Sequence, residues 1–218
     1  MSLIDLRDEP PTGPTAASPP PAASPSAGPV VLTPDLAPAP TLRIVEPGPA
    51  PAYDVAVVGL GYVGLPTALA FAAAGRSVLG LDASPARLAT IAAGEADLLP
   101  RDQQRLSRFL RQPVAQVADQ DDGSGGLVTT DDPSRLAEAD AVIVCVPTPI
   151  DQHLVPDLGP LRGACRTVVE HARPGQVLVL TSTTYVGCTA DLLVEPLRAR
   201  GLEPGTDVFV AFSPERID

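Results

Sequence analysis

The chain has 218 residues, of which 44% are hydrophobic and only 3% are aromatic. A core of mainly aliphatic side chains favours helices packed on a parallel sheet over an aromatic-rich all-β fold. The net charge is −11 and all 15 basic residues are arginines. The sequence thus lacks the basic stripe typical of nucleic-acid-binding proteins, and no nucleic-acid partner is expected.

Neither a membrane segment nor a metal site is predicted. The apolar runs fall short of the roughly 18 residues that cross a bilayer, and the acidic N-terminus does not resemble a signal peptide. Cys145, Cys165 and Cys188 are widely spaced, without a C-x-x-C or a neighbouring pair of histidines. This spacing suggests neither a disulfide framework nor a zinc site. Cys145 on an expected strand and Cys165 on an expected helix are predicted to be buried structural thiols. The default expectation is a cytoplasmic protein.

Residues 1–52 are rich in proline and alanine and hold about half of the 27 prolines. Proline supports neither helix nor sheet hydrogen bonding. The segment has few large apolar side chains to offset the entropy lost on ordering. We therefore predict a disordered tail, with docking of a partner as the alternative role.

From residue 53 to the end, short apolar strands alternate with helical segments. The expected strands are 54–59, 77–82, 127–130, 140–146, 177–181 and 208–212, and the expected helices are 63–74, 85–93, 101–112, 158–171 and 187–200. Such alternation predicts an α/β fold, a doubly wound parallel Rossmann sheet of six strands. Residues 53–218 would form this single domain.

A G-x-G-x-x-G motif joins the first expected strand to the first expected helix. It reads Gly59-Leu60-Gly61-Tyr62-Val63-Gly64. In this motif the first glycine permits a tight turn, the second lets a pyrophosphate approach the backbone, and the third allows close packing of helix and strand. The N-terminus of the helix then faces the phosphates. The motif predicts a dinucleotide-binding site.

Asp82 ends the second expected strand, 18 residues after Gly64. A carboxylate at this place accepts hydrogen bonds from the adenosine ribose hydroxyls and repels a 2′-phosphate, so NAD is expected rather than NADP. Arg87 lies one helical turn further on. It would reach the ribose or the phosphates, or else lie on the surface as a solvated arginine.

Four sequence motifs resemble the N-terminal half of the UDP-glucose/GDP-mannose dehydrogenase family. They are VGLGYVGLP at 58–66, VPTP at 146–149 with PDL at 156–158, STTYVG at 182–187 and SPERI at 213–217. The SPER of the last motif and the spaced PDL look most like the branch that oxidises UDP-N-acetylglucosamine or UDP-N-acetylmannosamine. A different Rossmann dehydrogenase, such as a hydroxyacyl-type enzyme, does not account for STTYVG followed by SPERI.

The resemblance implies an NAD-dependent 6-dehydrogenase that oxidises the C6 hydroxyl of a UDP-sugar to a carboxylate for polysaccharide precursors. It implies that Tyr62, Val63 and Thr148 lie beside the cofactor. It implies that Thr183 both contacts the cofactor and takes part in catalysis. Glu215 would be catalytic and, with Arg216, would contact the sugar substrate. A homodimer is expected when the family's second half is present.

The sequence departs from the family pattern in two ways. The chain contains no lysine, although the family uses a catalytic one, and the half that carries the nucleophilic cysteine is absent. We therefore expect a truncated chain that is inactive alone. The alternative is a non-catalytic NAD-binding module that survives as a degenerate paralogue.

Removal of the predicted tail should leave the domain intact. A chain that begins at Ala52 is expected to melt within a few degrees of the full chain, because the tail lacks residues that could join a core. Circular dichroism during heating measures this. A large fall in melting temperature would show that the tail packs on the domain.

Overall fold

A computed structural model describes residues 51–110, 125–149, 156–182 and 184–214. The predicted tail lies outside these ranges except for its last two residues, so its disorder stays a prediction. No helix within the described ranges is long and apolar enough to cross a membrane.

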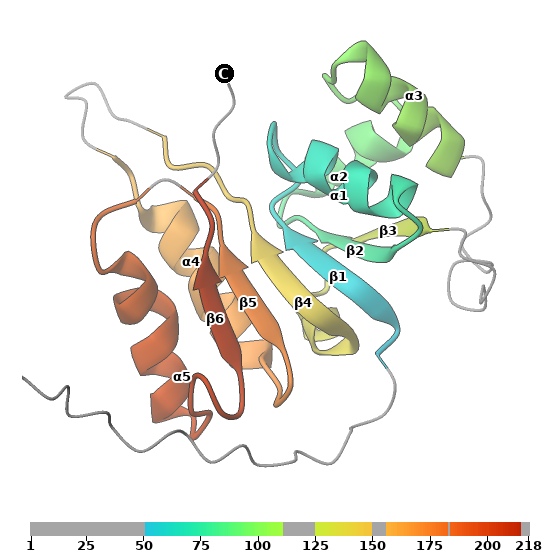
Figure 1. Cartoon of the computed structure of the whole chain (residues 1–218). Helices are drawn as coiled ribbons and strands as arrows, with labels where there is room; N and C mark the ends of the chain where they lie inside the picture. Colours follow the sequence, from blue (N-terminus) through green and yellow to red (C-terminus); the bar gives the residue numbers. More distant parts are fainter. Residues whose placement is uncertain (1–50, 111–124, 150–155, 183, 215–218) are drawn as a thin grey trace, which may run out of the picture. The chain divides into compact units, whose positions relative to one another are not determined.

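Strands and helices alternate along the described chain (Figure 1). The strands are β1 (Tyr53–Val58), β2 (Ser77–Leu81), β3 (Gly126–Thr130), β4 (Ala139–Val144), β5 (Val177–Leu180) and β6 (Phe209–Phe212). The helices are α1 (Gly64–Ala73), α2 (Pro85–Ala92), α3 (Pro100–Phe109), the 3-10 helix η2 (Pro133–Glu138), α4 (Gly159–His171), the π-helical segment η3 (Ala190–Val194) and α5 (Glu195–Ala199).

The six strands form one parallel sheet in the order β3-β2-β1-β4-β5-β6. The predicted doubly wound fold is therefore confirmed, and the strand bounds differ from those expected by no more than two residues. β1 pairs with both β2 and β4, so the winding direction reverses beside β1. In such sheets the ligand crevice lies at this reversal, outside the carboxyl ends of the strands.

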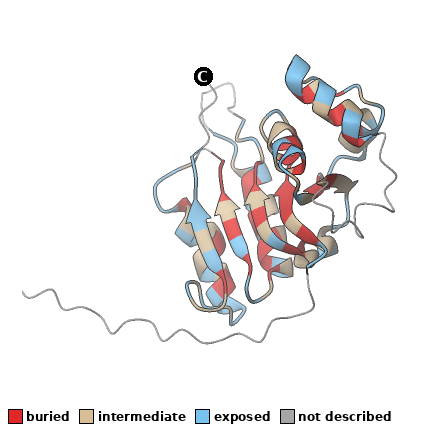
Figure 2. Cartoon of the chain, turned by 45° about the vertical axis from the view of Figure 1, so that its right-hand side comes forward, coloured by how far each residue is buried: buried red, intermediate tan, exposed pale blue. Residues whose placement is uncertain are grey.

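Both faces of the sheet are buried under helices around β1. Successive strand residues point to opposite faces. Val55 and Val57 therefore join the core cluster that includes α1, whereas Ala56 and Val58 join the cluster that includes α4. Figure 2 shows the buried residues running through the sheet and along the helix sides that face it. The continuous apolar run of β1 follows from this burial on both faces.

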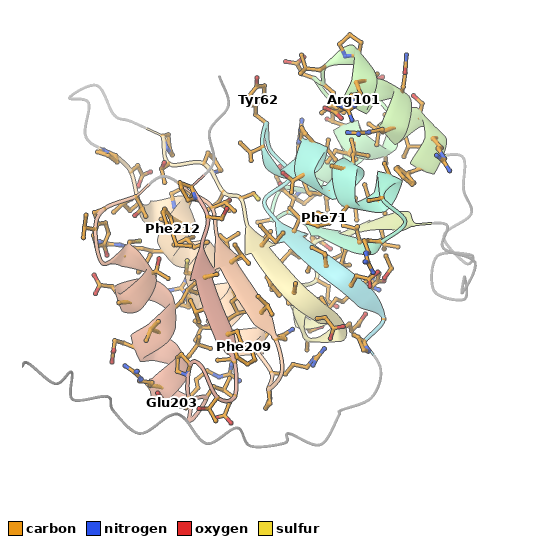
Figure 3. The ribbon with its side chains drawn as sticks, viewed as in Figure 1. Tyr62, Phe71, Arg101, Glu203, Phe209 and Phe212 are labelled. Carbon is orange, nitrogen blue, oxygen red and sulfur yellow. The ribbon has the colours of Figure 1, made fainter. Side chains whose placement is uncertain are left out.

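The edge of the sheet at β6 is more open than its centre. Phe209 is 47% exposed and Phe212 is 48% exposed. Figure 3 shows their side chains on the outermost strand, at the opposite end of the sheet from α1 and α3. The side chains of the edge strand β6 are therefore less buried than those of the central strand β1.

Two local features differ from the sequence-based expectations. The helix expected over 187–200 is not regular, because a π-helical segment precedes Pro196. Proline has no N–H for the usual helical hydrogen bond, and a local widening of the helix is a known way to accommodate it. The 3-10 helix η2 was not predicted. Asp132 caps it by accepting from the Ser134 N–H at 3.0 Å, and a single short turn leaves no helical periodicity to detect.

Candidate functional site

The turn after β1 requires glycine at its first position. Gly59 has a φ of +89°, which side chains of L-residues rarely tolerate. Its N–H donates to the carbonyl oxygen of Leu81 at 2.8 Å and ties the turn to the end of β2. A Cβ at this position would lie 2.9 Å from Cγ1 of Val146. The tight turn predicted for Gly59 is therefore present.

The other two glycines of the motif serve different ends. A Cβ on Gly64 would lie 1.8 Å from the carbonyl oxygen of Gly59, so only glycine lets α1 begin this close to the turn. A Cβ on Gly61 would meet nothing within 4 Å. The protein itself gives no reason for glycine at 61, and the space above it is free for a ligand. Val63, the residue before α1, supplies no capping side chain to the first helical turn.

Two side chains clamp the backbone of Leu60 from opposite sides. Oδ2 of Asp82 accepts the Leu60 N–H at 2.8 Å, and Nε of Arg87 donates to the Leu60 carbonyl oxygen at 2.8 Å. Oδ1 of Asp82 accepts the N–H of Ser84 at 2.9 Å, while Oγ of Ser84 caps α2 by accepting the N–H of Arg87. We call Asp82 and Arg87 the Leu60 clamp. It fixes the shape of the glycine-rich turn in advance of any ligand.

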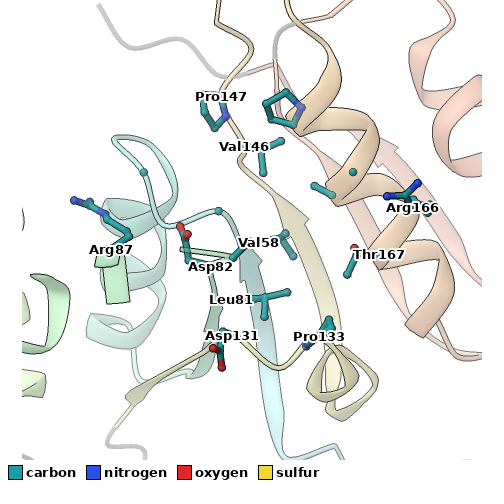
Figure 4. A pocket seen from close by; sticks show the side chains of 16 residues that line it. Val58, Leu81, Asp82, Arg87, Asp131, Pro133, Val146, Pro147, Arg166 and Thr167 are labelled. Atoms are coloured by element: carbon teal, nitrogen blue, oxygen red, sulfur yellow. The ribbon is translucent and has the colours of Figure 1, made fainter. Parts of the chain in front are cut away.

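A cavity of about 560 Å³ opens beside this turn (Figure 4). The cavity has two walls. One wall is formed by residues at or after the ends of β1, β2 and β3, and the other by residues that follow β4 or lie on α4. Figure 4 shows Asp82 and Arg87 on the first wall and Thr167 and Arg166 across from them. The lining residues are Val58, Gly59, Gly61, Leu81, Asp82, Ala83, Arg87, Asp131, Pro133, Val146, Pro147, Pro160, Gly163, Ala164, Arg166 and Thr167. The cavity is mostly apolar, with a few charged groups, as small-molecule sites usually are.

Several predicted site residues do not line this cavity. Tyr62 and Val63 line a separate hollow of about 230 Å³, together with residues around Asp97 and Leu99. Figure 3 shows the Tyr62 side chain projecting from the turn, and 67% of its surface is exposed. Thr148 follows the lining residue Pro147 without reaching the cavity itself. The backbone of residues 62 and 63 lies at the start of α1, where the first N–H groups of the helix have no acceptor within the helix.

The predicted catalytic and sugar-binding residues lie outside the described part of the chain. These are Thr183, Glu215 and Arg216. Their roles therefore stay predictions.

The two residues after β5 are hydrogen-bonded to the last residue of β4 and to the chain just beyond it. Oγ1 of Thr181 donates to the carbonyl oxygen of Val144 at 2.7 Å, and Oγ of Ser182 donates to that of Val146 at 2.7 Å. Both residues are buried. These two hydrogen bonds fix the chain after β5 against the end of β4.

This arrangement matches a known domain along its length. Residues 53–218 match the UDP-glucose/GDP-mannose dehydrogenase family, NAD binding domain. The chain belongs to this family. NAD is therefore the cofactor of the domain, and the open space at Gly61 beside the Asp82 carboxylate suits its pyrophosphate and ribose.

Curated relatives of this family are similar over the same region. Protein CapL of Staphylococcus aureus is 36% identical over 166 residues, which are 76% of this chain and 35% of CapL. The UDP-N-acetyl-D-glucosamine 6-dehydrogenase of Pseudomonas aeruginosa is 36% identical over 165 residues, 75% of this chain and 35% of that enzyme. The chain thus spans little more than a third of the length of these relatives.

Solved structures of the family share the fold. The UDP-D-ManNAc dehydrogenase of Pyrococcus horikoshii superposes with a TM-score of 0.63 at 34% identity, covering 75% of this chain and 36% of that one. A ternary complex of GDP-mannose dehydrogenase from Pseudomonas aeruginosa gives a TM-score of 0.63 at 25% identity, covering 76% and 36%.

The three cysteines lie in the interior of the domain. Cys145, Cys165 and Cys188 are all buried and unbridged. Burial raises the pKa of the Cys165 thiol to about 12, and nearby Cys188 adds to the effect. A thiol of this pKa stays protonated at neutral pH and is a poor nucleophile. Within the described ranges, no group of three or more His, Cys, Asp and Glu side chains is placed to hold a metal ion.

The part of the cavity that α4 and the β3–η2 loop supply was not predicted from the sequence. Pro160, Gly163, Ala164 and Thr167 of α4 line it, with Asp131 and Pro133 opposite. A signal was present, because these α4 positions are spaced i, i+3, i+4 and i+7 and so share one side of a helix.

The glycines at 61 and 64 should respond differently to substitution. Gly64→Ala is expected to destabilise the fold by about 3 kcal/mol or more, because its Cβ overlaps the Gly59 carbonyl. Gly61→Ala should leave the melting temperature unchanged and weaken NAD binding about tenfold, roughly 1.4 kcal/mol. Thermal unfolding and calorimetric titration measure the two effects. Equal NAD affinity of Gly61→Ala and wild type would contradict a pyrophosphate at this turn.

Proposed function

We propose that this chain is the cofactor-binding portion of an NAD-dependent UDP-sugar 6-dehydrogenase, which oxidises the C6 hydroxyl of the sugar to a carboxylate. The observation that carries the proposal is the preformed crevice, in which the Leu60 clamp fixes a glycine-rich turn beside a large cavity. NAD supplies the hydride acceptor for such an oxidation. The residues of the chain bind and orient it.

The contacts to NAD follow from the free hydrogen-bonding capacity around the turn. The N–H groups of Gly61, Tyr62, Val63 and Gly64 would face the pyrophosphate at the positive end of the α1 dipole, while Gly59, whose N–H is bonded to Leu81, would contribute the tight turn that lets the ligand approach. A carboxylate offers about four acceptor sites. Asp82 uses two of them on backbone N–H groups, which leaves two for ribose hydroxyls.

Arg87 and Thr148 complete the proposed cofactor contacts. Only Nε of Arg87 donates to a residue that the structure describes, so its terminal nitrogens remain for the adenosine ribose or the phosphates. Thr148 follows β4 beyond the lining residue Pro147. It would lie beside the nicotinamide, on the far side of the pyrophosphate from Asp82.

Catalysis is proposed for residues at the ends of β5 and β6. Thr183 would lie near both the cofactor and C6, as the family resemblance implies. Glu215 would act in proton transfer close to the reacting carbon. Glu215 and Arg216 would also contact the UDP-sugar.

The proposed substrate is a UDP-sugar of the N-acetylhexosamine type, used for polysaccharide precursors. The relatives from Pseudomonas aeruginosa and Pyrococcus horikoshii are named for UDP-N-acetyl-D-glucosamine and UDP-N-acetyl-D-mannosamine, respectively. A cytoplasmic enzyme would meet such substrates, and we expect it to form a homodimer when the remaining part of the dehydrogenase is supplied.

A non-catalytic NAD-binding module is the second candidate function. The chain would then bind NAD without oxidising a sugar. Turnover by the complete gene product separates the two candidates.

The Asp82 carboxylate is expected to set the preference for NAD over NADP. Asp82→Asn keeps an oxygen that can accept the Leu60 N–H but removes the charge that repels a 2′-phosphate. We expect NAD to bind at least about tenfold more tightly than NADP to the wild type, and Asn at 82 to narrow this ratio. Fluorescence titration measures both affinities. Glu95→Gln, an exposed carboxylate outside the cavity, is the control, and NADP binding as tight as NAD by the wild type would refute the assignment.

The 218-residue chain alone should not oxidise UDP-sugars. Catalysis of this kind depends on several groups acting together, and loss of one such group commonly lowers the rate by orders of magnitude. We expect no NADH absorbance above the no-enzyme control with UDP-glucose, UDP-N-acetylglucosamine or UDP-N-acetylmannosamine. Measurable turnover would show that Thr183 or Glu215 supports the chemistry without the lysine and cysteine of the family.

A further inference from the structure

The side chain of Leu60 anchors the glycine-rich turn in the interior of the protein. Leu60 lies between Gly59 and Gly61, yet none of its surface is exposed. It belongs to the core cluster that includes α1, together with Val57 and Val78. Connecting segments usually lie at the surface, so a fully buried leucine in a turn is unusual. The turn is therefore held by core packing as well as by the Leu60 clamp.

Gly80 lies directly beside the Leu60 side chain. It is buried within β2, where it pairs with Val57 of β1 and Thr129 of β3. Glycine weakens the interior of a strand and often marks the close approach of another group. Its φ is not positive, so the backbone conformation does not require glycine here. A Cβ on Gly80 would lie 3.0 Å from Cδ1 and 3.1 Å from Cδ2 of Leu60, and this contact explains the missing side chain.

Leu60 has little freedom to move away from a larger residue at position 80. Asp82 holds its N–H and Arg87 holds its carbonyl oxygen, each at 2.8 Å. Its side chain is enclosed in a packed core, where added volume forces the neighbouring groups to shift. The other neighbour of a Cβ at 80, Cδ1 of Leu127, would be at an ordinary contact distance of 3.5 Å. A methyl group at position 80 would therefore act on Leu60 and on the turn that carries it.

We propose that Gly80 is a positioning residue for NAD. Its missing side chain leaves room for Leu60, and Leu60 in this place holds the glycine-rich turn in the conformation that receives the pyrophosphate. The inference rests on the proposed contact between this turn and the pyrophosphate. It extends that contact to a residue of β2 that does not line the cavity. A turn ordered in advance by this packing loses less conformational entropy when NAD binds.

Substitutions of Gly80 should weaken NAD binding in the order of side-chain size. We expect the affinity to fall severalfold in Gly80→Ala and at least about tenfold in Gly80→Val. Calorimetric titration measures this at a temperature where circular dichroism shows every variant to be folded. In the absence of NAD, amide exchange followed by NMR should become faster at Leu60 and stay unchanged at Val57. A general loss of stability would instead speed exchange at Val57 as well.

Leu60→Val tests whether Gly80 acts through Leu60. This substitution removes both methyl groups that a Cβ at position 80 would approach. In the Leu60→Val background, Gly80→Ala should change NAD affinity by less than about twofold, so that the two substitutions are not additive. Ala72→Val is the matched control. It crowds the same core cluster near the end of α1 remote from the turn, and should lower the melting temperature without changing NAD affinity.

The outcomes separate the role of Gly80 from the proposed function. If the wild type binds NAD and Gly80→Val binds it equally well, the positioning role is wrong and the cofactor role stands. An equal loss of affinity from Gly80→Ala with and without Leu60→Val, or a similar loss from Ala72→Val, would also overturn the positioning role. Failure of the wild type to bind NAD would overturn the proposed function itself.

Discussion

The close approach of α1 to the end of β1 is the constraint on which the site depends. A Cβ on Gly64 would lie 1.8 Å from the carbonyl oxygen of Gly59, so two glycines set the distance between strand and helix. This distance brings the N-terminus of α1 to the point where the strand order reverses. The helix dipole and the N–H groups of the first turn then meet at the mouth of the crevice.

The Leu60 clamp fixes the conformation of the glycine-rich turn that follows β1. Asp82 and Arg87 hold the N–H and the carbonyl of one residue, so the turn between Gly59 and Gly61 has little freedom to rearrange. A site that is ordered before binding loses less conformational entropy when the ligand arrives. Asp82 holds the turn through two backbone N–H groups, and in the proposed complex its remaining acceptor sites would serve the ribose.

The sequence predicted those parts of the molecule that rest on local chemistry. The six strands were recognisable because β1, β2 and β4 are short apolar runs bounded by turns. The roles of Gly59 and Gly64 followed from the motif alone. The motif did not reveal that the side chains of Tyr62 and Val63 turn away from the cavity, because side-chain direction at the start of a helix depends on packing.

Other features depended on contacts that a single sequence does not display. η2 is too short for helical periodicity, and the π-helical segment reflects Pro196 acting within a longer helix. Gly163 belongs to the cavity only because α4 folds back beside β1 and β4. Only the folded structure shows that Gly163 lines the cavity.

The central claim is that NAD binds in the crevice between the glycine-rich turn and α4. Backbone hydrogen exchange of the wild-type chain, with and without saturating NAD, tests it most directly. We expect slower exchange with NAD at residues 60–64 and 84–87, and around 163–167, with no change at residues 97–99 beside the smaller hollow. Slowing at 97–99 with none at 60–64 would contradict the account.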